Sequence, residues 1–174
     1  MKPLLNVVGG LILVFLDLRV GGGGLQLDLL PDPVGWVVVM VALARLAPVH
    51  QGFRVGAIAA GVGALVSAPV WPGPALVGPA APWLGIAAGV VDLVVVVAAL
   101  TGVMASVPAR AGGARTLRTT YVVAAGGYAL LVLGGLVSTA LEVLALMAVL
   151  VNLVVTVVVL VFLGSASSET PDPA

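Results

Sequence analysis

The sequence contains no cysteine, one histidine and one lysine, and charged residues make up only 8% of its 174 positions. Without cysteine there can be no disulfide bond, thiolate metal site or thiol catalysis. Soluble domains carry about 25% charged residues, so this chain lacks the side chains needed for a water-facing surface. The formal net charge is zero, which gives no electrostatic basis for binding nucleic acid, and nucleic acid is not an expected partner.

Enzyme motifs are missing as well. The sequence has no His–Glu zinc motif and no G-x-S-x-G nucleophile elbow. The four glycines at 21–24 are not followed by Gly-Lys-Ser/Thr, so they indicate a linker and not a phosphate-binding loop. His50 falls in a short expected loop, where a lone imidazole is solvated and does not make a metal site. We therefore expect no catalytic residue, no metal and no cofactor.

The chain does contain long hydrophobic segments. Hydrophobic residues make up 61% of it, and the mean hydropathy is +1.28. A spanning helix needs roughly 20 mostly apolar residues, and the runs here lack the period-two alternation of barrel strands. The sequence predicts an all-α polytopic transmembrane bundle in one domain, residues 1–163, followed by a disordered cytoplasmic tail, residues 164–174. The expected spans are residues 4–18, 33–46, 55–70, 84–104, 119–136 and 143–163.

The basic residues predict the orientation of this bundle. With six spans, Lys2 and five of the six arginines fall on one side, including those of a basic loop at 112–120, and only Arg19 falls on the other. The positive-inside rule then places both termini in the cytoplasm. The three tryptophans fall at span ends on the opposite side, as interfacial anchors do. The excess of arginine over lysine, with abundant Ala, Val and Gly, is typical of a GC-rich bacterial genome, so we expect a bacterial cytoplasmic membrane.

The stretch "DLLPDPVGW", residues 28–36, places two acids and two prolines where the second span begins. Proline suits the first position of a helix, so Pro33 predicts a helix start with Asp32 as its N-cap at the outer interface. A second interpretation is an acidic mouth that gathers cations, formed by Asp17, Asp28 and Asp32. Both interpretations remain open at this stage.

The same stretch carries a resemblance. The residues Leu30, Pro31, Asp32, Gly35 and Trp36 resemble the L-P-D-x-x-G-[WY] signature of a family of small bacterial polytopic membrane proteins of uncharacterised function. The resemblance covers about residues 25–46. It implies a multi-helix inner-membrane protein, and it implies no activity, ligand or catalytic residue.

Asp92 interrupts the fourth span, where an aspartate costs ~2.5–3.5 kcal/mol on insertion scales. Gly85 and Gly89 share its helix face, so we expect this face to lie against another helix. Asn152 and Thr156 form a polar face at similar depth in the sixth span, and the three polar residues make a candidate intramembrane polar core. This core is either a buried hydrogen-bonded group that holds the bundle together, or a proton or cation relay.

Two functions follow from these alternatives. The first is a structural or accessory membrane component, and the second is a small proton- or cation-linked transporter or channel that uses Asp92. The lipid bilayer is the expected partner, and the small-residue faces suit a second copy of the chain or another membrane protein. A polar cavity that reaches Asp92 would favour transport. Tyr121 and Tyr128 lie seven residues apart on one face of the fifth span, with no assigned role.

Overall fold

The computed structural model describes residues 2–15, 19–22, 25–28, 32–71, 77–135 and 142–170. Six α-helices account for most of this part of the chain, so the prediction of an all-α protein with six helices is confirmed. Two short 3-10 turns, η2 (Gly78–Ala80) and η3 (Pro108–Arg110), precede the fourth and fifth helices. The helices are α1 (Pro3–Phe15), α2 (Asp32–Leu46), α3 (Gln51–Ser67), α4 (Ala81–Ser106), α5 (Ala111–Gly135) and α6 (Glu142–Ala166).

A β-hairpin was not predicted. β1 (Arg19–Gly22) and β2 (Leu25–Asp28) pair antiparallel, with Arg19 opposite Asp28, so Gly21 and Gly22 belong to a strand and not to a linker. Pairing satisfies backbone N–H and C=O groups that a loop would leave to solvent. The sequence pattern missed it because strands of four residues, two of them glycine in β1, carry too short an alternation of side chains to be recognised.

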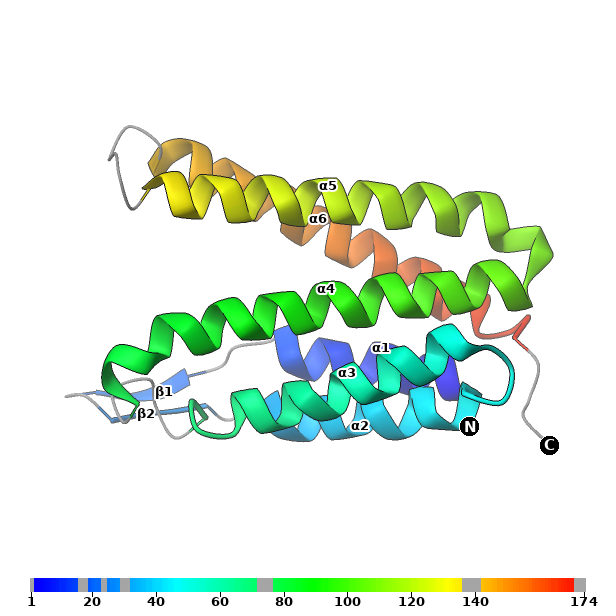
Figure 1. Ribbon diagram of the computed structural model, residues 1–174, viewed down its shortest axis with the longest axis horizontal. Coiled ribbons are helices and arrows are strands. Elements are labelled where there is room, and N and C mark those ends of the chain that lie inside the picture. Colours follow the sequence, from blue (N-terminus) through cyan, green and yellow to red (C-terminus); the bar gives the residue numbers. More distant parts are fainter. Residues whose placement is uncertain are drawn as a thin grey trace.

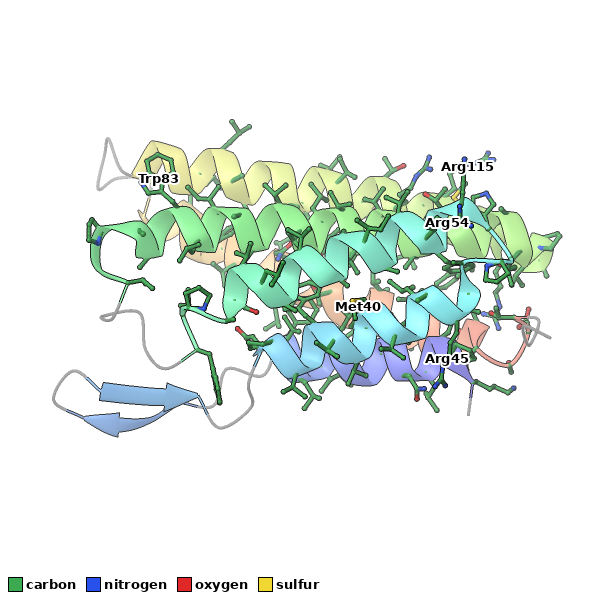
Figure 2. The ribbon with its side chains drawn as sticks, turned by 60° about the horizontal axis from the view of Figure 1, so that its bottom comes forward. Met40, Arg45, Arg54, Trp83 and Arg115 are labelled. Carbon is green, nitrogen blue, oxygen red and sulfur yellow. The ribbon has the colours of Figure 1, made fainter. Side chains whose placement is uncertain are left out.

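Each helix packs against the next one along the chain, and α6 also contacts α1. Successive helices run in opposite directions (Figure 1). Figure 1 shows α4 lying between the α1–α3 group and the α5–α6 pair. The end of the bundle where α1 starts and α6 ends also carries Arg54 and Arg115, and Trp83 lies at the opposite end (Figures 1 and 2). The sequence predicted that arginines and tryptophans lie at opposite ends of the bundle, and these three residues do.

The first two helices meet at a pair of glycines. A Cβ built on Gly10 would lie 2.8 Å from the Gly35 carbonyl oxygen, and a Cβ built on Gly35 would lie 2.8 Å from the Gly10 oxygen. Neither distance leaves room for a side chain, because backbone cannot move aside cheaply. The glycine of the "LPDPVGW" stretch therefore lets α1 approach α2 to backbone contact.

Trp36, expected as an interfacial anchor, is a core residue. Only 1% of its surface is exposed, and a Cβ built on Gly63 would lie 2.7 Å from its ring atom Cδ2. The missing side chain at Gly63 of α3 thus makes the notch that receives the indole from α2. Trp71 and Trp83, by contrast, are 40% and 72% exposed.

The polar segments near the arginine-bearing end are more helical than predicted. α5 begins at Ala111, so the expected basic loop at 112–120 is the first part of that helix. α6 continues to Ala166, and residues 167–169 form a turn. The tail predicted to be disordered from 164 is therefore ordered through residue 170. Several serine and threonine hydroxyls in these segments bond carbonyls three or four residues back, as Ser167 bonds Gly164.

Among the described residues, two segments are long and apolar enough to cross a membrane by length and composition, Gly78–Ser106 and Met147–Ala166. The helices Pro3–Phe15 and Gln51–Ser67 are apolar but shorter. At ~1.5 Å per residue, the 26 residues of α4 extend for about 39 Å and exceed a ~30 Å hydrocarbon core, whereas the 13 residues of α1 extend for about 20 Å.

Candidate functional site: a polar cluster joining α4, α5 and α6

A hydrogen bond joins α4 to α5 near the middle of α4, and a buried polar residue of α6 lies beside it. The Tyr121 hydroxyl of α5 donates to Asp92 Oδ2 of α4, and Thr156 of α6 lies near the same hydroxyl. Tyr121 is 1% exposed, Thr156 is buried and Asp92 is half-buried. Asp92 therefore has a protein partner in place of water on one of its two oxygens. We call Asp92, Tyr121 and Thr156 the polar cluster.

Two buried oxygens of the predicted polar core remain unpaired among the described residues. Asp92 Oδ1 and Asn152 Oδ1 are both buried without a hydrogen-bond partner there. Asn152 lies one helical turn before Thr156 on α6. Both oxygens are acceptors when Asp92 is ionised, and a proton on Asp92 Oδ1 would convert one of them into a donor.

The structure brings together two of the three predicted core residues, Asp92 and Thr156, and the residue that joins them was missed. Tyr121 stood out in the sequence only by its spacing from Tyr128, which is 36% exposed. A buried tyrosine within an apolar run needs a hydrogen-bond partner for its hydroxyl, and this requirement could have marked Tyr121 as a member of the polar core. The partner itself could not be identified, because residues 29 positions apart meet only through the α4–α5 packing.

The glycine pair expected to face another helix does not do so within the described chain. Gly85 and Gly89 are exposed, and a Cβ built on either would meet nothing within 4 Å. Farther along the same stripe of α4, Val96 is buried. The face of α4 that carries Gly85, Gly89, Asp92 and Val96 is therefore covered only from Asp92 onward. Neighbouring helices pack against α4 there and leave its first turns open.

The acids at the start of the chain are only partly described. Asp17 lies outside the described residues, and Asp28 is placed in β2 by its backbone alone. α2 begins at Asp32, one residue before the predicted start at Pro33, so the carboxyl lies in the first helical turn. A carboxylate is favourable there because it faces the positive end of the helix dipole. The helix cap and the acidic mouth both stay predictions.

At the arginine-bearing end, one ion pair ties the end of α6 to the start of α5. Arg110 donates from Nε and Nη2 to Glu169 Oε1 at 2.9 and 2.6 Å. The hydrogen bond from Arg110 holds the pKa of the Glu169 carboxyl below its usual range. Because the pair is in contact with solvent, its contribution to stability is small.

A cleft of about 600 Å³ opens between α3, α4 and α5, and Asp92 is not among its lining residues. At one end of it, His50 Nδ1 accepts the Gly52 N–H at 3.0 Å and so caps α3. Within the part of the chain that the structure describes, no group of three or more His, Cys, Asp or Glu side chains could hold a metal ion. The cleft is lined by His50, Gln51, Gly52, Val55, Leu93, Val94, Val97, Ala98, Thr101 and Val122.

Comparison with protein-family models, with curated proteins and with solved structures gave no match for this chain. The resemblance of "LPDPVGW" to a membrane-protein signature therefore remains a prediction. In the part of the chain that the structure describes, there are six helices, two of them suited by length and composition to crossing a membrane, and a carboxyl of α4 hydrogen-bonded to α5. Any functional conclusion depends on this geometry.

Proposed function

We propose that this chain is a six-span protein of the bacterial cytoplasmic membrane, with both termini in the cytoplasm and a structural or accessory role. The observation that carries the role is the engagement of Asp92 by Tyr121, with Thr156 behind it. A buried hydrogen bond between Asp92 and Tyr121 holds α4 and α5 in register. The cleft beside it is lined by other residues, so it does not supply the polar cavity that transport through Asp92 requires.

The exposed surface supports a membrane location for all six helices. Each helix presents large apolar side chains outward, and water would not tolerate so many in one small protein. Lipid accepts them, since hydrocarbon requires no polar partner. The helices shorter than a hydrocarbon core can still cross, because a bundle thins the bilayer locally or uses flanking residues. Examples, one per helix, are Leu5, Val37, Ile58, Val90, Leu130 and Val161.

The proposed topology predicts the outcome of reporter fusions. A fluorescent protein fused after Arg110 should be fluorescent in the cytoplasm, and alkaline phosphatase fused there should be inactive. Alkaline phosphatase fused after Trp83 should be active, because this residue lies at the tryptophan-bearing end of the bundle. Phosphatase activity from the Arg110 fusion would contradict the six-span topology.

Variants of the polar cluster test the structural role. Tyr121→Phe should lower stability by about 1 kcal/mol, since interhelical hydrogen bonds in membranes contribute ~0.6 and at most ~1.7 kcal/mol. Asp92→Asn should cost less than Asp92→Leu, because asparagine keeps an acceptor for the Tyr121 hydroxyl. Thermal melting in detergent of Asp92→Leu, Tyr121→Phe and the double variant measures the coupling energy. Strictly additive losses would show that this hydrogen bond does not stabilise the fold.

The second candidate is a small proton- or cation-linked transporter or channel. The unpaired oxygens Asp92 Oδ1 and Asn152 Oδ1 favour it, because a buried carboxyl with a free acceptor can take up a proton. Proton flux into liposomes distinguishes the two candidates with the same variants. For the structural role we expect no flux above empty liposomes in wild type or Asp92→Asn. Flux in wild type that a folded Asp92→Asn abolishes would overturn the structural role and establish the relay.

A further inference from the structure

We propose that the cleft between α3, α4 and α5 binds one anionic phospholipid of the cytoplasmic leaflet. Its acyl chain would lie along α4 and its phosphate would lie at the arginines near the cleft's polar end. This inference rests on the proposed membrane location, and it goes beyond the proposed role because it names a ligand class and the residues that bind it.

The body of the cleft suits a hydrocarbon chain. Its volume of about 600 Å³ lies within the ~300–1,000 Å³ typical of ligand sites. Val55 of α3, Val94 and Val97 of α4 and Val122 of α5 give it apolar walls. From Leu93 to Thr101 it follows α4 for about 12 Å at ~1.5 Å per residue. An acyl chain is the apolar ligand that a bilayer supplies at this depth.

One end of the cleft is polar and cationic. His50, Gln51 and Thr101 line it there, and Arg118 Nη1 of α5 donates to Thr101 Oγ1 at 3.3 Å. That bond uses one of the five N–H donors of the guanidinium, so Arg118 keeps donors for a further acceptor. His50 Nδ1 accepts a backbone N–H, which leaves Nε2 to carry the ring proton as a donor.

Further arginines extend this positive end. Arg115 lies one turn before Arg118 on the same side of α5, and Arg54 lies next to Val55 on α3. Figure 2 shows Arg54 and Arg115 at the same end of the bundle, while Arg45 projects from α2 on the other side. Among the described acidic side chains only Glu169 lies at this end, and Arg110 pairs with it.

Charge and depth together select the ligand. Guanidinium groups bind phosphate through parallel N–H bonds, and positive pockets between helices on the cytoplasmic side bind anionic headgroups. A soluble anion would leave the apolar walls uncovered, and a zwitterionic lipid would bring a cation toward the arginines. An anionic glycerophospholipid matches both the apolar body and the cationic end of the cleft.

Native mass spectrometry of the full chain in detergent tests the site. Phosphatidylglycerol and phosphatidylcholine with identical acyl chains are titrated separately, and we expect one phosphatidylglycerol to bind more tightly than phosphatidylcholine. Replacing Arg115 and Arg118 by glutamine together should weaken phosphatidylglycerol about tenfold or more. The matched control Arg45→Gln removes an exposed arginine of the same end, away from the cleft, and should leave binding unchanged.

A second pair of variants tests the apolar body. Val94→Trp places an indole in the cleft and should weaken phosphatidylglycerol, whereas Val90→Trp, one turn earlier and outside the lining, should not. Excess inorganic phosphate should fail to displace the lipid. Equal affinity for the two lipids, equal losses in the matched pairs, or displacement by phosphate would each overturn the proposal. Six spans confirmed by reporters with no preference for phosphatidylglycerol would overturn the lipid site alone.

Discussion

Alanine in place of Trp36 should destabilise the folded chain by about 3–5 kcal/mol, the loss typical of removing a large buried aromatic side chain. The ring is 1% exposed, and it fills the notch at Gly63, where a built Cβ would also lie 3.0 Å from Val91 Cγ1 of α4. Removing it would open a cavity where α2, α3 and α4 meet. Because the unfolded ring would also rest in lipid, the loss is mainly of van der Waals packing.

Thermal melting in one detergent measures this effect against Trp83→Ala. Trp83 is 72% exposed, so its removal should change the melting temperature little. The comparison separates the core position from the interfacial anchor that the sequence predicted for both residues. Equal and small losses in the two variants would show that Trp36 contributes as an anchor and not as a core residue.

Alanine in place of Gly10 should destabilise the protein by about 1–3 kcal/mol through overpacking. The added methyl would lie 2.7 Å from Val39 Cγ2 and 2.8 Å from the Gly35 carbonyl oxygen. The valine could change rotamer, but the carbonyl belongs to α2 itself, so the two helices would have to separate. Their separation would weaken the packing along the whole α1–α2 contact.

The adjacent glycine is the matched control for this change. A Cβ on Gly9 would meet nothing within 4 Å, so Gly9→Ala should be neutral or should stabilise α1 by roughly 0.5–1 kcal/mol through helix propensity. Thermal melting curves of Gly9→Ala and Gly10→Ala compare the stabilities of the two variants. A Gly10→Ala protein as stable as Gly9→Ala would contradict the close crossing of α1 and α2.

The sequence determined the helical class and the approximate positions of the helices. Long apolar runs predict helices through composition alone, and helix hydrogen bonds are local, so six helices could be located without tertiary information. The same reasoning located Asp92 as the residue in most need of a partner, because an acid in an apolar run is costly wherever the run folds. Boundaries shifted where polar segments such as 112–120 continue a helix, since their hydropathy resembles that of a loop.

Only the tertiary structure decided which residues meet. Gly85 and Gly89 are four residues apart on one helix face and were expected to meet another helix, yet they are open. Gly10 and Gly35, on separate helices, lie at a backbone contact that their positions in the sequence do not indicate. Tryptophan at a helix end favours the interface, but Trp36 is buried because Gly63 of another helix leaves room for it. Such choices depend on shape complementarity between helices distant in sequence.

The partners of Asp92 and the presence of the cleft likewise depend on how the helices pack. Tyr121 reaches Asp92 only because α5 packs against α4 at that depth, and Thr156 lies near the Tyr121 hydroxyl because α6 packs against α5. No spacing along one helix encodes these contacts. The cleft beside them exists because α3, α4 and α5 do not fill the space between them. Local periodicity fixes which side chains share a helix face, whereas the packing of faces depends on contacts between several helices at once, and one sequence pattern does not contain them.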